Sequence, residues 1–195
     1  MILQITNYKL QISDFIRQLP KAELHVHLEG SVEPPTLVEL SRKYDAAPLD
    51  AAAVEELYRY ADFPGFLNAF KNVTERLRAP QDYELIANRL MARLAEQNVV
   101  HAEVIFSAGV CLWRKQDVRA IFAAMERARE QAEHEFGISI LWIWDAIRQF
   151  GVEHAGQVLD EALRAREQFE SVAGFGIGGD EHRRRTDRTR YHRDS

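Results

Sequence analysis

The segment KAELHVHLEGS, residues 21–31, decides the fold because it has the pattern of a β-strand that ends in polar residues. Side chains alternate between the two faces of a strand. The polar positions His25, His27 and Glu29 are therefore expected on one face. The apolar positions between them, Leu24, Val26 and Leu28, are expected in a hydrophobic layer on the other. Neutral imidazole nitrogens are good zinc ligands, so the pattern predicts a strand that supplies two metal ligands. The plainer alternative is two half-buried histidines without a metal.

Three further strands follow along the chain. Residues 99–106, 138–145 and 172–177 are rich in β-branched and aromatic residues. Apolar residues recur at helical spacing between the strands, and the predicted helices cover residues 34–44, 50–60, 66–77, 80–94, 117–136 and 152–169. Residues 62–65 are predicted as a turn. Strands that alternate with helices favour a parallel sheet with helical crossovers, and four βα units are half of an eight-stranded barrel.

The composition indicates a single core and no membrane segment. The chain has 195 residues, 46% of them hydrophobic, whereas a complete TIM barrel needs about 250. Residues 1–18 are expected to be a leader segment without an apolar run, and Cys111 is the single cysteine of the sequence. These features predict a cytoplasmic protein without disulfides or a membrane partner.

The charge is unevenly distributed along the sequence. The net charge is −5, yet residues 182–195 contain six arginines and two aspartates. This segment has one large apolar residue, Tyr191, and we expect it to be a disordered tail. The tail lacks interleaved aromatic residues, so nucleic acid is an unlikely partner. The preceding residues 19–181 are predicted to form the folded unit.

The longer segment LPKAELHVHLEGS, residues 19–31, resembles the opening signature of the adenosine deaminase family. This resemblance implies a metal-dependent hydrolase on a TIM barrel that removes the amino group of an adenine nucleoside. It also implies that His25 and His27 bind zinc. The resemblance further implies which residues bind the purine nucleoside. Glu29 would contact the sugar, Phe66 would belong to an apolar lid, and Gly179 would meet the purine ring. Ser107 and Arg148 would lie at the mouth of the barrel, where the substrate enters.

The sequence departs from the family pattern in three ways. Glu29 stands where many members have aspartate, and the residues after Ser107 resemble members that act on larger adenine compounds such as aminodeoxyfutalosine. The His-Ala-Gly-Glu motif, which supplies a third histidine and the general acid, does not occur in the sequence. Hydrolytic deamination needs a zinc-activated water and a proton donor. The chain is therefore expected to be an incomplete, inactive half of the enzyme with no catalytic residue of its own.

Two other functional classes stay open on the sequence alone. The chain could belong to another metal-dependent hydrolase built on the same His-x-His strand, or it could be a non-enzymatic fragment whose basic tail touches nucleic acid. Outside the site, His101 is expected to have a structural role, and Trp142 and Trp144 are expected to pack in the core.

Overall fold

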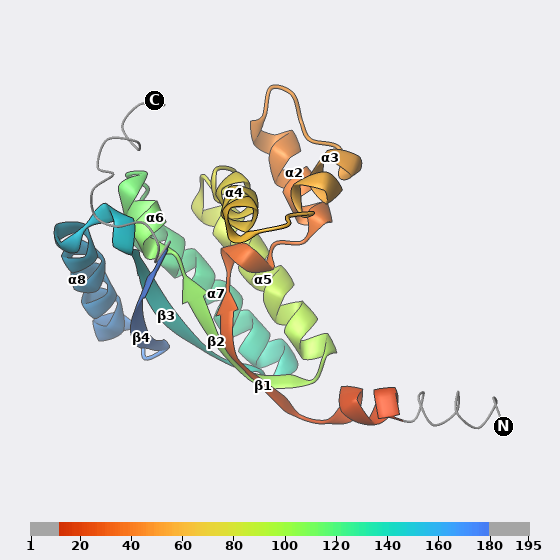
Figure 1. Ribbon diagram of the computed structural model, residues 1–195. Helices are drawn as coiled ribbons and strands as arrows, with labels where there is room; N and C mark the ends of the chain where they lie inside the picture. Colours follow the sequence, from red (N-terminus) through yellow and green to blue (C-terminus); the bar gives the residue numbers. More distant parts are fainter. Residues whose placement is uncertain (1–11, 180–195) are drawn as a thin grey trace.

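The computed structural model describes residues 12–179, which form four parallel strands alternating with helices (Figure 1). The strands are β1 (Lys21–His27), β2 (Val99–Phe106), β3 (Ser139–Ile147) and β4 (Val172–Gly178). They lie in the order β1-β2-β3-β4, and each neighbouring pair is parallel. This arrangement confirms the predicted fold class, a partial α/β barrel.

Helices connect the strands and precede them. Residues 12–18 are helical. The helices that follow are η1 (Glu29–Ser31), α2 (Pro34–Tyr44), α3 (Ala51–Leu57), α4 (Phe63–Thr74), α5 (Pro80–Glu96), α6 (Ala108–Trp113), α7 (Val118–Phe136), η2 (Arg148–Phe150) and α8 (Val152–Gln168). In residues 12–179, no helix is both long enough and apolar enough to cross a membrane.

Side-chain caps fix where several helices begin. The carboxylates of Asp50, Asp62 and Asp117 accept hydrogen bonds from backbone N–H groups at the starts of α3, α4 and α7. The prediction of a turn at residues 62–65 was wrong, because Asp62 caps α4 and the next three residues are its first turn. Helix α3 ends at Leu57, three residues before the predicted end. Gly137 ends α7 in the left-handed conformation with φ of 69°.

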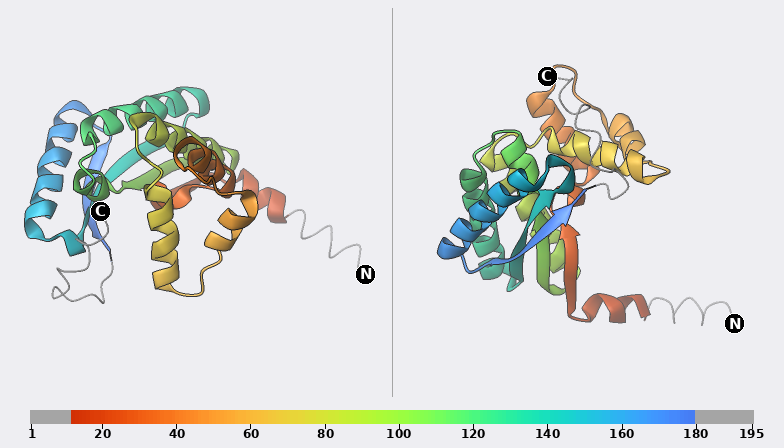
Figure 2. Two further views of the ribbon diagram at one scale, coloured as in Figure 1. Left: turned by 90° about the horizontal axis from the view of Figure 1, so that it is seen from above. Right: turned by 60° about the vertical axis from the view of Figure 1, so that its left-hand side comes forward.

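The core lies between the sheet and the long helices α5, α7 and α8, which cover one side of it (Figure 2). Ala102, Val104 and Phe106 of β2 are fully buried on this side, as their alternation predicts. Trp142 and Trp144 are also buried, which confirms their role in packing. The Trp142 indole N–H donates to the carboxylate of Glu126 over 2.6 Å, which satisfies its polar group inside the core.

Leu24 differs from the sequence prediction. Its side chain is 59% exposed, although the alternation of β1 assigns it to the hydrophobic layer. Strand β1 pairs only with β2 among the described residues and lies at the sheet edge. The pairing of β1 with β2 shifts its register between Glu23 and Val26, so the regular alternation is interrupted at Leu24. Leu28, at the end of the same strand, is fully buried.

Two of the predicted segments fall largely outside the described residues. The leader was predicted over residues 1–18, and the structure describes only its helical part from residue 12. The predicted disordered tail, residues 182–195, lies wholly outside them, as do Asp180 and Glu181.

Candidate active site

The predicted site residues meet at the carboxyl ends of the parallel strands. His27 of β1 is level with Ile105 of β2, which is level with Ile143 of β3. Ser107 directly follows β2, and Gly178 ends β4. In parallel α/β sheets this edge is where ligands bind, because the loops that follow the strands converge there.

His25 and His27 lie side by side on one face of β1. Their ring centroids are 5.3 Å apart and the rings are nearly perpendicular. His25 is exposed and His27 is half-buried. Burial, and next the nearby charge of His25, lower the pKa of His27. The lowered pKa favours the neutral imidazole, which is the form that binds metal ions.

Glu29 takes a different position from the one predicted. Strand β1 ends at His27, and Glu29 begins the short helix η1 instead of continuing the strand face. Its side chain is 1% exposed. One carboxylate oxygen accepts from the Ser107 backbone N–H over 3.0 Å, and the other accepts from the Ser107 hydroxyl over 3.1 Å. Glu29 and Ser107 thus join the ends of β1 and β2.

The pKa of Glu29 is raised to about 7, chiefly because burial removes water from the carboxylate. The backbone N–H groups of Glu29 and Ser107 and the Ser107 hydroxyl oppose this shift. The negative charge of Asp145 adds to it. A carboxyl group with this pKa changes protonation near neutral pH.

Asp145 is the site residue that sequence reasoning missed. It lies near the end of β3 and is 4% exposed. Burial raises its pKa to about 6, against the opposing effects of the Gly178 backbone N–H, which bonds to the carboxylate, and of the charges of Arg148 and His25. The sequence contained a signal for this residue. Asp145 is an acidic residue in an otherwise apolar strand, and burial of a carboxylate is costly unless other groups pair with it.

The glycines at the end of β4 allow the backbone to approach Asp145 and η2. A Cβ atom on Gly178 would lie 2.5 Å from a carboxylate oxygen of Asp145. Gly179 has φ of +107°, and a Cβ atom there would collide with the side-chain amide of Gln149. Arg148, predicted to face the mouth, is an exposed residue of η2 next to Gln149.

The predicted lid helix α4 carries a cluster of aromatic rings. The Phe66 ring contacts those of Tyr60, Phe63 and Phe70 at centroid distances of 5.5, 5.9 and 6.2 Å. The Phe70 ring also lies 3.8 Å from the position of a Cβ atom on Gly30, in η1. The cluster is therefore packed beside the segment that directly follows His27.

A zinc ion would find two ligands in this arrangement. Structural and catalytic zinc sites have three or four protein ligands. Among residues 12–179, no group of three or more His, Cys, Asp or Glu side chains is placed to hold a metal ion. The pair His25 and His27 fits half of a zinc site by chemistry and spacing, and the described residues do not complete it.

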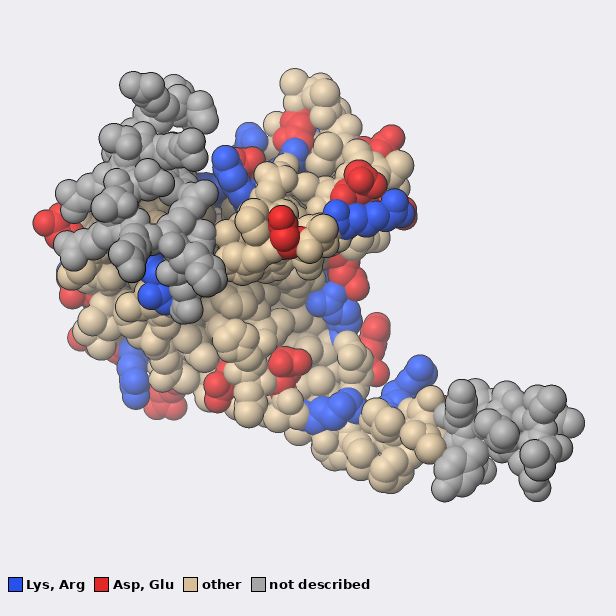
Figure 3. Space-filling view, viewed as in Figure 1, with Lys and Arg blue, Asp and Glu red and all other residues tan. Residues whose placement is uncertain are grey.

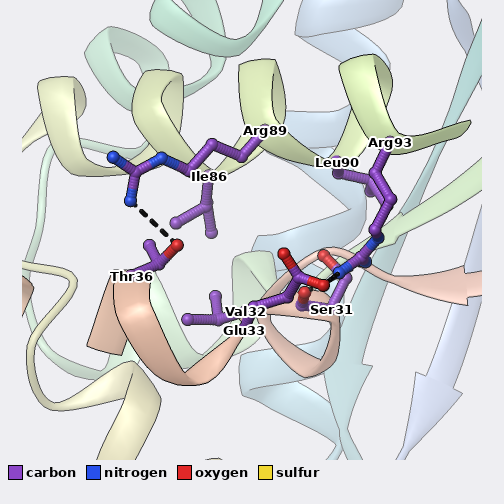
Figure 4. Close-up of a pocket in the computed structure, with 8 residues that line it drawn as sticks. All are labelled: Ser31, Val32, Glu33, Thr36, Ile86, Arg89, Leu90 and Arg93. Atoms are coloured by element: carbon purple, nitrogen blue, oxygen red, sulfur yellow. Dashed lines mark hydrogen bonds and ion pairs between the residues drawn. The ribbon is translucent and has the colours of Figure 1, made fainter. Parts of the chain in front are cut away.

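A small pocket between η1, α2 and α5 is separate from the two histidines (Figure 4). Its two guanidinium groups already have partners. Arg89 donates to the Thr36 hydroxyl over 2.8 Å, and Arg93 pairs with Glu33 over 2.8 Å. The pocket thus joins α2 to α5 and offers no free cation to a ligand.

The surface charge is mixed on the face seen in Figure 3. Lysine and arginine side chains are interspersed with aspartate and glutamate over this face. A nucleic-acid site would instead gather basic side chains in a stripe or patch.

Comparison with known proteins agrees with this geometry. The sequence pattern that defines the family described as Adenosine deaminase matches residues 20–195. An aminodeoxyfutalosine deaminase from Streptomyces avermitilis is 34% identical over 172 residues, which cover 87% of this chain and 48% of the relative. An adenine deaminase from Rhodospirillum rubrum is 36% identical over 169 residues, 85% of this chain and 49% of the relative.

A solved structure shows the same half-barrel within a longer chain. An amidohydrolase from Burkholderia ambifaria, crystallised with bound zinc, superposes with a TM-score of 0.78 at 28% identity, covering 88% of this chain and 47% of that one. The chain described here spans about half the length of the relatives it matches. The match of the family pattern over most of the sequence shows that this chain belongs to the adenosine deaminase family.

Proposed function

We propose that this chain carries the metal-binding strand and part of the purine-binding wall of a zinc-dependent hydrolase that deaminates an adenine nucleoside or a related adenine compound. The observation that carries the proposal is the His25 and His27 pair at the carboxyl end of β1, with rings 5.3 Å apart. The pair lies where active sites of (β/α)-barrel enzymes lie.

The roles of the individual residues follow from their surroundings. His25 and His27 would hold the zinc ion, which when bound lowers the pKa of its water towards 7. Glu29 would contact the sugar, held in place by its two hydrogen bonds from Ser107. Gly179 would leave room for the flat purine ring. Phe66, within the aromatic cluster of α4, would exclude water from the bound substrate.

Two further residues would line the mouth of the same site. Arg148, exposed in η2, and Ser107, at the end of β2, are proposed to face the substrate from the loops after β3 and β2. The relatives named above are an aminodeoxyfutalosine deaminase and an adenine deaminase. Their names support an adenine compound as the substrate class and leave adenosine as one of several candidates.

We further propose that the 195-residue chain by itself lacks deaminase activity. Two imidazoles leave half of a tetrahedral zinc site to water. Asp145 and Glu29, the buried carboxyl groups at the strand ends, are held by Gly178 and Ser107. The sequence lacks the family's His-Ala-Gly-Glu segment, which would supply the proton donor for the ring nitrogen.

Metal binding tests the assignment of the histidines without requiring activity. Cobalt(II) can replace zinc and reports imidazole coordination by visible absorption. We expect weak binding that is reduced strongly by His25→Ala or His27→Ala. His134→Ala is the matched control, because His134 is an exposed residue near the end of α7. Equal binding by all three variants and the wild type would refute the ligand assignment.

Turnover tests the second part of the proposal. The zinc-loaded chain, freed of excess metal, is incubated with adenosine, adenine and a 5′-substituted adenine nucleoside, and deamination is followed by ultraviolet absorbance. We expect no turnover above background. Stoichiometric zinc together with turnover that His25→Ala abolishes would show that the chain is an active enzyme.

A further inference from the structure

We propose that Asp145 is a positioning residue for substrate binding, whose carboxylate fixes the backbone of Gly178 and Gly179 in the place where it meets the purine ring. The inference rests on the role of Gly179 proposed above and adds the residue that sets its position. Asp145 would act through this backbone and not through a contact of its own with the purine.

The strand register places Asp145 on the inward face of the sheet, opposite to the long helices. Ile143 of β3 lies in one row with His27 and Ile105. Asp145 is two residues further along β3, so its side chain shares the face of that row. Between residues 143 and 147, β3 pairs regularly with β4, and Asp145 is opposite Gly176. Its carboxylate is therefore next to the last residues of β4.

The carboxylate of Asp145 lies directly against the backbone of β4. A Cβ atom on Gly176 would lie 3.3 Å from one of its oxygens, and a Cβ atom on Gly178 would lie 2.5 Å from the other. The backbone N–H of Gly178 donates a hydrogen bond to this carboxylate. The absence of a side chain on both glycines allows the carboxylate and the strand to approach each other so closely.

The hydrogen bond between Gly178 and Asp145 lies in a place with little water. The Asp145 side chain is 4% exposed. Burial raises its pKa to about 6, and the N–H of Gly178 is the first of the groups that oppose this rise. Hydrogen bonds to ionised groups are roughly twice as strong as those between neutral groups. Removal of the carboxylate would leave the N–H of Gly178 without this acceptor.

The backbone of Asp145 is itself fixed on another side by α6. A Cβ atom on Gly109, in the first turn of α6, would lie 3.1 Å from the Asp145 carbonyl oxygen and 3.0 Å from the Ile147 nitrogen. Gly109 thus allows α6 to pack directly on the end of β3. A side chain on a backbone held in this way presents its carboxylate in one defined place.

Gly179 follows the residue that Asp145 holds. Its φ of +107° is a conformation that glycine adopts readily. It is half-buried, and the side-chain amide of Gln149 lies where its Cβ atom would be. The carbonyl of Gly178 and the N–H of Gly179 belong to one planar peptide group. A change in the position of Gly178 would therefore also move the N–H of Gly179.

A fixed backbone matters for the binding of a flat ring. Groups that must become ordered when a ligand binds reduce its affinity, whereas groups already in position do not. Hydrogen bonds also weaken steeply when donor and acceptor are poorly aligned. We therefore expect Asp145 to contribute to purine affinity through the position of the Gly179 peptide.

Glycine-selective NMR of the full chain tests the hold of Asp145 on this backbone. Gly178 and Gly179 form the one Gly-Gly pair in the sequence. Glycine labelled at its nitrogen and its carbonyl carbon therefore identifies Gly179 by a unique carbon–nitrogen coupling. We expect Asp145→Ala to shift both signals and to speed hydrogen exchange of the Gly178 amide at least about tenfold. Asp145→Asn should restore both, because its amide oxygen accepts the same hydrogen bond.

Internal references and a matched control accompany this measurement. The signals of Gly137 and Gly156 serve as references, because a Cβ atom on either would meet nothing within 4 Å. Asp160→Ala is the control variant, because Asp160 is an exposed carboxylate on α8. It should leave the signals of Gly178 and Gly179 where they are in the wild type.

Two results of this experiment would overturn the proposal. One is a folded Asp145→Ala variant whose Gly178 and Gly179 signals and exchange rates equal those of the wild type. If Asp145→Ala does not fold, Asp145→Asn decides the question. Fast exchange of the Gly178 amide in folded Asp145→Asn is the second result, since the retained acceptor should protect that amide.

Titration with adenosine connects the backbone to the substrate. Adenosine should shift the Gly179 signal of the wild type and of Asp145→Asn, whereas uridine, which has the sugar and lacks the purine, should not. Asp145→Ala should need at least about tenfold more adenosine for the same shift. Equal responses of the wild type and Asp145→Ala would overturn the role of Asp145 alone. No response of the wild type would refute the purine assignment of Gly179, and the proposal would fall with it.

Discussion

Both carboxylate oxygens of Glu29 are bound by one residue, Ser107, through its backbone N–H at 3.0 Å and its hydroxyl at 3.1 Å. The contact joins the end of β1 to the end of β2 at the mouth of the site. It holds a fully buried acidic side chain in one orientation. A charged or polar group in such a place is stable only while its hydrogen bonds are made.

Ser107→Ala should therefore destabilise the chain. The variant keeps the backbone N–H and removes the hydroxyl, which leaves one buried carboxylate oxygen without its partner. We expect the free energy of unfolding to fall by about 1–3 kcal/mol, measured by urea denaturation. Ser139→Ala is the control, because Ser139 is exposed and should change stability by less than about 0.5 kcal/mol. Equal stability of the two variants would show that the Glu29 contact is unimportant.

Asp82 should contribute stability that depends on pH. Its buried carboxylate accepts from Lys43 and Tyr44, both over 2.6 Å, and from the backbone N–H groups of Arg78 and Ala79. Burial opposes ionisation, but these hydrogen bonds outweigh it and lower the pKa of Asp82 below its ordinary 3.8. A lowered folded-state pKa stabilises the fold above the unfolded pKa, and the stabilisation is lost as the pH falls through the folded value.

Asp82→Asn should remove this contribution. We expect a loss of about 2–3 kcal/mol at pH 7, because the charged hydrogen bonds become neutral or are lost. The difference from the wild type should shrink below about pH 4, where the unfolded carboxyl group is protonated. Urea denaturation across this pH range measures it. A difference that stays constant at low pH would contradict the assignment.

Gly178→Ala should disturb the site from the end of β4. The new Cβ atom would lie 2.5 Å from a carboxylate oxygen of Asp145, so the strand or the carboxylate must move. We expect a destabilisation of about 1–3 kcal/mol by thermal or urea unfolding.

A second glycine supplies the control for that experiment. Gly156 lies inside α8, and a Cβ atom there meets nothing within 4 Å. Gly156→Ala should stabilise the chain by about 0.4–1 kcal/mol, because alanine loses less conformational freedom in a helix. If Gly178→Ala raised the free energy of unfolding as Gly156→Ala does, the result would contradict the close approach of Gly178 to Asp145.

Removal of residues 182–195 should leave the melting temperature unchanged. This segment has six arginines and one large apolar residue, so it can bury little apolar surface to offset the entropy lost on ordering. Differential scanning calorimetry of a chain that ends at Glu181 tests the expectation. A clear drop in the melting temperature would show that the segment packs on the fold.

The sequence by itself determined the four strands, the longer helices and their order, whereas the short helices η1, α6 and η2 were not predicted. The alternation of apolar residues gave strand β2 its bounds, and the glycine at 137 marked the end of α7, because these signals act over a few neighbouring residues. The pairing of His25 with His27 followed from the two-residue repeat of a strand. Local stereochemistry is enough for predictions of this kind.

Only the tertiary structure decided what each side chain faces. It turned Glu29 out of the strand into η1 and onto Ser107, 78 residues away in the sequence. It buried Asp145 beside Gly178, and it left Leu24 exposed on an edge strand that alternation alone assigns to a core. Burial and hydrogen-bond partners depend on contacts between distant segments, and these set the pKa values and the free energies on which the candidate site depends.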